Sequence, residues 1–151
     1  MEEYGMKNEM ILEFDAVSQN ESFARVAVAA FIAPYNPTLE ELSDVKTAVS
    51  EAVTNAIIHG YDECEGKVRV ICCMRERQLQ VTIEDQGLGI EDVERAMEPL
   101  FTTKPHLDRS GMGFAFMEAF MDVLMVESTP GKGTVVRMQK ELGVIRESGE
   151  E

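Results

Sequence analysis

Two side chains of one helical segment, Glu51 and Asn55, have the types and spacing for phosphoryl chemistry. They are four residues apart, which places them one turn apart on the same helix face. A carboxylate can take the proton of a hydroxyl nucleophile, and a neighbouring carboxamide can hold a hydrated magnesium ion. The pair alone does not distinguish this chemistry from two polar residues on a solvated helix face.

Glycine-rich turns follow in the second half of the chain: Asp85-x-Gly87-x-Gly89, Gly111-Met112-Gly113 and Gly131-x-Gly133-Thr134. Glycine lets the backbone approach a nucleotide closely. The second turn precedes a predicted helix, whose first N–H groups can bind phosphate oxygens. Asp85 ends a predicted strand, where its carboxylate can accept a hydrogen bond from an adenine amino group. One such turn is common in loops, but three behind a Glu-x-x-x-Asn helix together predict a nucleotide site.

Residues 98–112 lack periodicity and contain two prolines, which is typical of a long loop that acts as a lid or a binding loop. Lys104 and Arg109 are the only Lys or Arg residues in this loop. A guanidinium beside Gly111 can hold a terminal phosphate and stabilise the charge that develops in phosphoryl transfer. A solvated loop arginine is the alternative interpretation.

The elements that must position these motifs follow from periodicity and capping signals. Strands are expected at 8–15, 67–74, 78–84, 123–127 and 134–139, and helices after Ser18, after Thr38, at 91–97 and after Gly113. Ser18-x-x-Glu21 and Thr38-x-x-Glu41 both have the form of a capping box. This order predicts a two-layer α/β sandwich with helices on one face of a mixed, mostly antiparallel sheet.

Two of these helices are rich in apolar residues. The first has no charge between residues 26 and 33, so we expect either core burial on more than one side or a contact with a dimer mate or partner. In the last helix, we expect the side chains that face inward to be Phe116, Met117, Phe120 and Met121.

Length and composition indicate one domain, with an ordered core at about 8–141 and a polar tail in a chain of 151 residues. The net charge of −14, from 14 basic and 28 acidic residues, argues against nucleic-acid binding. No apolar run is long enough to cross a membrane. Cys64, Cys72 and Cys73 lack metal-ligand spacing, so we expect reduced thiols in a cytoplasmic protein.

The four motifs, in this order, resemble the boxes of the Bergerat-fold ATPase/kinase superfamily, which includes gyrase-type ATPases, histidine kinases and anti-sigma serine kinases. The resemblance covers about residues 8–140. Within it, EAVTNAIIHGY (51–61), PLFTTKP (99–105) and RSGMGF (109–114) are similar to the anti-sigma F factors of spore-forming bacteria.

This resemblance implies a homodimeric protein-serine kinase that sequesters sporulation sigma factor F and uses ATP with Mg²⁺ to phosphorylate the anti-anti-sigma factor. It implies that Glu51 is the catalytic base, that Arg109 contacts the γ-phosphate, and that Asn55 holds the Mg²⁺. It implies that Asp85 contacts adenine, and that Glu21 and Arg25 contact the protein partners. The other nucleotide-binding residues that it implies are Gly87, Gly89, Thr103, Lys104, Ser110, Gly111, Met112, Gly113 and Thr134.

Other functions share the same motifs. A catalytic ATP-binding fragment of a histidine kinase would need a separate helical hairpin with an acceptor histidine, and the residues before Glu51 are already used by the fold. Another Bergerat-fold ATPase, of the gyrase type, would need a following transducer domain. A nucleotide-independent binding module would use the glycines only to shape turns, and ATP would neither bind nor stabilise it.

Overall fold

The computed structural model describes residues 7–60, 66–90, 93, 97 and 113–143. Its strands form one sheet in the order β1-β2-β3-β5-β4, and every pairing is antiparallel. The strands are β1 (Lys7–Asp15), β2 (Lys67–Arg75), β3 (Gln78–Asp85), β4 (Val123–Thr129) and β5 (Gly133–Glu141). The five expected strands are therefore confirmed, in a sheet that is antiparallel rather than mixed.

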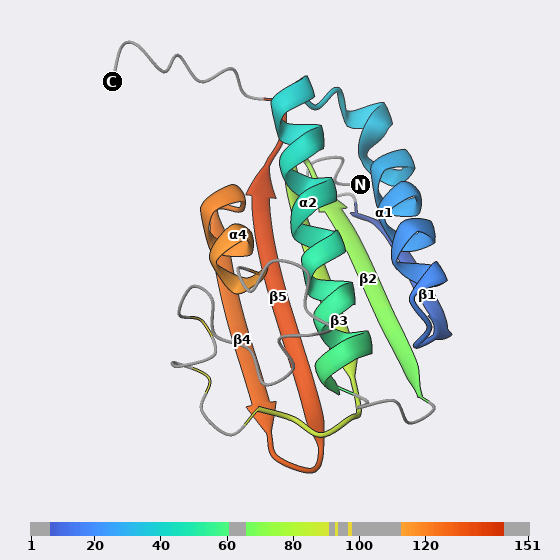
Figure 1. The fold of residues 1–151 in the computed structure, drawn as a ribbon. Coiled ribbons are helices and arrows are strands. Elements are labelled where there is room, and N and C mark those ends of the chain that lie inside the picture. The colour runs from blue at the N-terminus through green and yellow to red at the C-terminus, as the bar shows by residue number, and fades with distance from the viewer. Residues whose placement is uncertain (1–6, 61–65, 91–92, 94–96, 98–112, 144–151) are drawn as a thin grey trace.

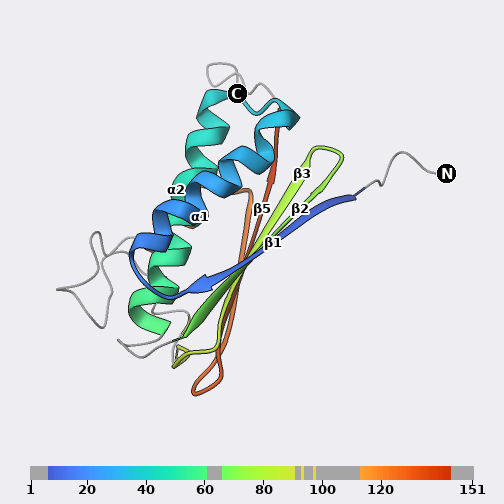
Figure 2. The same ribbon diagram turned by 90° about the vertical axis from the view of Figure 1, so that its right-hand side faces the viewer.

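The helices lie on one face of this sheet (Figure 1). They are α1 (Gln19–Ile32), α2 (Leu39–Asn55) and α4 (Gly113–Phe120), with a short 3-10 turn η1 (Ala33–Tyr35) after α1 and a π-helical turn η2 (Ala56–Gly60) after α2. In the described part of the chain the opposite sheet face carries no helix (Figure 2). The two-layer α/β fold is confirmed. The helix expected at 91–97 is described only at Val93 and Met97, where Met97 N donates to Val93 O.

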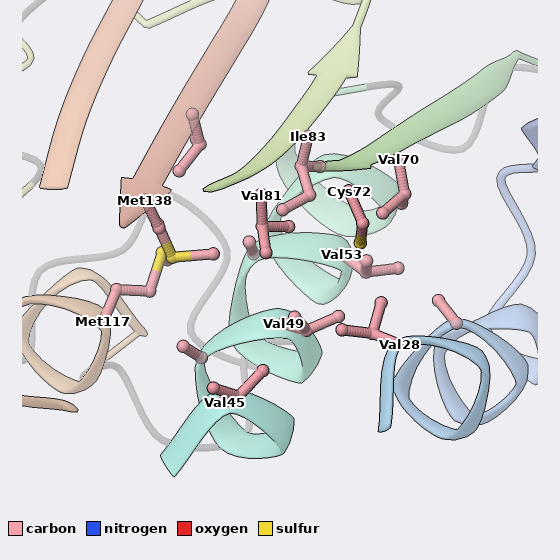
Figure 3. Packing of buried hydrophobic residues seen from close by; sticks show 14 of the residues in the cluster. Val28, Val45, Val49, Val53, Val70, Cys72, Val81, Ile83, Met117 and Met138 are labelled. Carbon is pink, nitrogen blue, oxygen red and sulfur yellow. The ribbon is translucent and has the colours of Figure 1, made fainter. Parts of the chain in front are cut away.

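Helix α2 occupies the centre of the core, between α1 and α4 (Figure 3). Val45, Val49 and Val53 form its buried stripe and face the sheet. Val28 of α1 packs on one side of this stripe, and Met117 of α4 lies on the other. Each fully buried valine stabilises the fold by about 1.5–3 kcal/mol. This packing fixes the rotation of α2, and with it the direction in which Glu51 and Asn55 point.

The start of α2 is a complete capping box, as predicted. Glu41 N donates to Thr38 Oγ1 at 3.0 Å, and Thr38 N donates to Glu41 Oε1 at 2.9 Å. The same carboxylate oxygen accepts a hydrogen bond of 2.7 Å from Gly143 N. One buried glutamate therefore holds both the helix start and the chain that follows β5.

The capping box predicted at the start of α1 does not form. Ser18 has helical dihedral angles, and its side chain makes no capping hydrogen bond. The Glu21 carboxylate instead accepts a hydrogen bond of 2.5 Å from Ser50 Oγ of α2 and lies 3.1 Å from Arg25 Nε. A contact between helices has therefore replaced the local cap.

Two expectations about apolar helix faces are only partly confirmed. In α1 only Ala24, Val28 and Ile32 are buried, whereas Phe23 and Val26 are 52% and 60% exposed. The helix is therefore buried on one side only, and a partner contact at its outer side stays a prediction. In α4 the buried side chains are Phe114 and Met117, and Met121 directly after the helix is also buried. The predicted inward positions Phe116 and Phe120 are half-buried, and their rings stack on each other.

The cysteines of β2 point to opposite sides, as expected for neighbours in a strand. Cys72 and Cys73 are free thiols, and burial raises the pKa of the Cys72 thiol to about 12. Cys64 lies outside the described residues. Among the described helices, none combines the length and apolarity that a membrane span requires.

Candidate functional site

One close approach within the candidate site joins the end of α2 to the start of α4. A methyl group added at Gly113 would lie 3.1 Å from Asn55 Nδ2 and 3.3 Å from Glu51 Oε1. Gly113 is buried, while Glu51 and Asn55 are half-buried. The structure therefore brings the predicted base and the predicted metal ligand against the glycine of the second turn. The absence of a side chain at Gly113 leaves room for both polar groups.

This junction also has a useful electrostatic arrangement. The first N–H groups of a helix are not used within it and carry partial positive charge, so the start of α4 favours anionic oxygens. Glu51 and Asn55 lie in the last two turns of α2 and supply a carboxylate and a carboxamide beside that start. N–H groups that can bind an anion, a carboxylate that can act as a base and a carboxamide oxygen that can bind a metal thus lie side by side. This set suits a phosphate group whose transfer needs a base.

A second group of predicted residues lies where β3 ends and β5 begins. Asp85 pairs with Thr134 in the antiparallel register, and both are buried. Gly87 N donates to Asp85 Oδ1 at 2.9 Å. Burial raises the pKa of the Asp85 carboxyl, and the backbone N–H groups of Gly87 and Thr134 oppose this shift. Asp85 is thus a fixed hydrogen-bond acceptor in a poorly solvated position.

The turn between β4 and β5 supports the loop that carries Gly87 and Gly89. Gly131 N donates to Leu88 O at 2.7 Å, and Ile90 N donates to Ser128 Oγ at 2.7 Å. Gly89 has a φ of 80° and packs against the backbone of Thr129. These contacts bring the first and third glycine-rich turns of the sequence side by side.

Both groups lie at the same end of the molecule. The last turns of α2, the end of β3 and the start of β5 all reach this end (Figure 1), and η2 contacts both strands. The remaining predicted residues of the nucleotide site are outside the described part of the chain, so their placement stays a prediction: Thr103, Lys104, Arg109, Ser110, Gly111 and Met112.

The donor set fits magnesium through Asn55 and substrate phosphates. No group of three or more His, Cys, Asp or Glu side chains capable of holding a metal occurs among the described residues. Magnesium usually keeps several waters and takes only one or two protein ligands together with phosphate oxygens. A single carboxamide beside an anion-favouring helix start satisfies that pattern.

The two predicted partner residues lie elsewhere, on α1, where Glu21 contacts Arg25 and Ser50 at the edge of a cavity of about 390 Å³ between α1 and α2. Arg25 lines this cavity, and its Nε lies 3.1 Å from Glu21 Oε2 without the alignment of a hydrogen bond. Its Nη2 donates to Ser22 Oγ at 3.2 Å. The other lining residues are Leu39, Leu42, Ser43, Lys46, Thr47 and Ser50. Two cations and three hydroxyl groups make this cavity suitable for an acidic side chain.

Sequence reasoning missed three residues that shape the surroundings of Asp85 and the cavity between α1 and α2. Ser128 accepts a hydrogen bond from the loop after Asp85, Ser50 holds Glu21, and Lys46 adds the second cation of the cavity. Ser50 precedes Glu51 directly, and a polar residue beside the predicted base was the only signal available for it. Neither Ser128 nor Lys46 stands in a recognisable motif.

Comparison with known proteins gives a consistent result. Residues 15–140 match the family model of the histidine kinase-like ATPase domain. The chain is 61% identical over 138 residues to the anti-sigma F factor of Bacillus subtilis (strain 168), covering 91% of this chain and 94% of that protein. It is 54% identical over 142 residues to the anti-sigma F factor of Clostridium acetobutylicum, covering 94% and 99%.

Solved structures share the fold at low sequence identity. One is the Mycobacterium tuberculosis crystal structure with RsbU and RsbW domains, with a TM-score of 0.66 and 19% identity over 89% of this chain and 32% of that one. Another is the catalytic domain of the histidine kinase ThkA, with a TM-score of 0.54 and 16% identity over 88% and 96%. Both likenesses concern the fold alone.

Proposed function

We propose a function that proceeds from family membership: this chain belongs to the anti-sigma F factors, which carry a histidine kinase-like ATPase domain. We infer that it sequesters a sporulation sigma factor F and is an ATP-dependent protein-serine kinase. Its substrate is a serine of the anti-anti-sigma factor, and it acts as a homodimer in the cytoplasm. The whole chain then serves as a single ATP-binding kinase domain.

One observation carries the kinase part of this proposal. Gly113 lies directly against both Glu51 and Asn55, so the start of α4 and the end of α2 line the same site. A fold that only binds a partner has no need for a carboxylate beside an anion-favouring helix start. A kinase needs this combination to hold a phosphate and activate a hydroxyl group.

The reaction assigns one step to each of these groups. The serine oxygen of the substrate protein attacks the γ-phosphorus of ATP while its proton passes to the Glu51 carboxylate. A new P–O bond to serine forms, the bond from the γ-phosphorus to the β–γ bridging oxygen breaks, and ADP leaves. The N–H groups at the start of α4 hold phosphate oxygens, and Arg109 stabilises the transferred group. Magnesium held through Asn55 would neutralise phosphate charge.

The base of the nucleotide is assigned to the second group of residues. The Asp85 carboxylate accepts a hydrogen bond from the adenine amino group, and Gly87 holds that carboxylate in place. Thr134 lies opposite Asp85 in the sheet register. The charged phosphates then extend toward the start of α4.

A phosphate-tracing experiment tests the kinase proposal. The purified chain is incubated with γ-labelled ATP, magnesium and an anti-anti-sigma protein, and the position of the label is found by phosphopeptide mapping. We expect label on a serine of the partner. Label on His59 or His106 of this chain would indicate a histidine kinase instead, and label only in free phosphate would indicate an ATPase.

The sigma-binding part predicts that Arg25→Ala weakens the complex with sigma factor F. Its guanidinium has five N–H groups, of which Nε and one on Nη2 face Glu21 and Ser22. The others can bind a carboxylate of the partner. Loss of a central arginine raises the dissociation constant by about 10- to 100-fold, which titration calorimetry with purified sigma factor can measure.

A matched control for Arg25 is Arg69→Ala. Arg69 lies on the helix-free sheet face and is 3.8 Å from Glu13, so it has a similar ion pair on the side of the sheet opposite α1. We expect Arg69→Ala to bind sigma factor as the unaltered chain does. Equal losses in both variants would show that net charge, not the cavity between α1 and α2, governs binding.

A further inference from the structure

A cluster of hydroxyl groups closes the end of the site where β3, β4 and β5 meet. Ser128 Oγ of β4 lies 2.8 Å from Thr134 Oγ1 and 3.1 Å from the carbonyl oxygen of Gly133. It also accepts the hydrogen bond of 2.7 Å from Ile90 N. Ser128 is half-buried and Thr134 is buried, so the cluster is largely shielded from water.

The number of available protons decides how this cluster is arranged. A serine hydroxyl has one proton and two lone pairs. If Thr134 donates to Ser128 and Ser128 donates to Gly133 O, all three contacts of Ser128 are hydrogen bonds. If Ser128 donates to Thr134 instead, the Gly133 contact has no proton. The first arrangement makes one more hydrogen bond in a shielded position, so it is favoured.

This arrangement determines what Thr134 can offer to a ligand. Its only hydroxyl proton is used by Ser128, so its oxygen can only accept a hydrogen bond. Asp85, the residue opposite Thr134 in the β3–β5 register, is also an acceptor. Two acceptors on neighbouring strands favour a base with an amino group and disfavour one with a carbonyl oxygen at that position.

We propose that Ser128 is a positioning residue that sets base specificity by keeping the Thr134 hydroxyl in its acceptor state. The proposal rests on the proposed function, because it takes the Asp85 end of the site as the place of the base. Ser128 itself does not touch the nucleotide. Adenine presents an amino group where hypoxanthine presents a carbonyl oxygen, so inosine triphosphate is the appropriate competitor.

Removal of the Ser128 hydroxyl should relax this selection. In Ser128→Ala the Thr134 hydroxyl is free to rotate and to donate to a carbonyl oxygen. We expect the ratio of the dissociation constants of Mg-ITP and Mg-ATP to fall by about three- to tenfold, the size of one hydrogen bond. Ser128→Thr keeps the oxygen and suits a strand, so it should retain the ratio of the unaltered chain.

Titration calorimetry with Mg-ATP and Mg-ITP measures this ratio for each variant. Glu127→Gln is the matched control, because Glu127 is the preceding residue in β4, is exposed and pairs with Arg137. A general loosening of the strand would weaken both nucleotides equally and leave the ratio unchanged, which would overturn the proposal. So would an equal fall of the ratio in Ser128→Thr or in Glu127→Gln.

The affinities of the unaltered chain for Mg-ATP and Mg-ITP distinguish failure of this inference from failure of the proposed kinase function. If it binds Mg-ATP and Mg-ITP with equal affinity, the site binds nucleotides but the Ser128 inference is wrong. If it binds neither nucleotide, the proposed kinase function fails and the inference fails with it. Thermal unfolding of each variant without nucleotide shows whether a change in fold accompanies a change in the ratio.

Discussion

Replacement of Glu51 by glutamine is expected to slow phosphoryl transfer to the anti-anti-sigma factor by about 10²–10⁴-fold, the usual size of general-base catalysis. The carboxamide has nearly the same size, so it preserves the packing of Glu51 beside Gly113. It cannot take the serine proton. The affinity for Mg-ATP should stay nearly unchanged, because the base acts in the transfer step. Single-turnover assays with saturating ATP measure the transfer rate directly.

A matched control for this change lies on the same helix. Glu40 is exposed in the first turn of α2, far from Gly113, so Glu40→Gln makes the same chemical change outside the site. We expect it to transfer phosphate at the rate of the unaltered chain. A normal rate in Glu51→Gln would show that another group takes the proton. A large loss of nucleotide affinity would instead assign Glu51 to binding.

The second large effect is expected from Gly133→Ala at the start of β5. Gly133 has a φ of 116°, and an added methyl group would collide with the carbonyl oxygen of Asp85 and lie 2.7 Å from Gln86 Cα. Both are backbone atoms, so β3 and β5 would have to separate. Backbone strain and overpacking together should lower the free energy of unfolding by about 2–5 kcal/mol. Thermal and denaturant unfolding measure this loss.

Gly131→Ala is the control that distinguishes the stability lost to backbone strain from the stability lost to the steric collision at residue 133. Gly131 has a φ of 82°, but no atom lies within 4 Å of the position where its methyl group would be. Strain alone should cost about 1–2 kcal/mol. Gly133→Ala should also lower the affinity for Mg-ATP, because it displaces Asp85. Gly131→Ala should bind Mg-ATP with the affinity of the unaltered chain. If both variants lose equal stability, the close approach to Asp85 is not the reason for glycine at residue 133.

The sequence correctly predicted features that depend on residues close together in the chain, and it failed where a distant segment takes part. The Thr38 capping box formed because both of its partners lie within one helical turn. The same pattern at Ser18 failed because Ser50, on another helix, offers Glu21 a hydrogen bond that the sequence near Ser18 does not reveal. The apolar run of α1 likewise predicted burial, but within the described residues α1 packs on α2 and the sheet with one side only, so Phe23 and Val26 stay exposed.

The candidate site shows the same division. Spacing alone placed Glu51 and Asn55 on one helix face, and it placed Asp85 at the end of a strand. The approach of Gly113 to that helix face was not derivable from periodicity, because it depends on how α4 packs against α2. Resemblance to a family placed these residues in one nucleotide site, but it did not predict this contact. Ser128 had no signal of either kind, since its contacts arise from the order in which the strands are paired.

The strand order has a consequence for when the protein becomes competent during its synthesis. β5 lies between β3 and β4, so the ladder that pairs Asp85 with Thr134 cannot be complete before the chain has been made through Glu141. A nascent chain emerging from the ribosome therefore has the acidic helix but not the strand pairing that holds the proposed adenine contacts. Pairings between distant segments also slow folding. If Asp85 and Thr134 hold the base as proposed, nucleotide stabilises only the molecule in which β5 has been inserted.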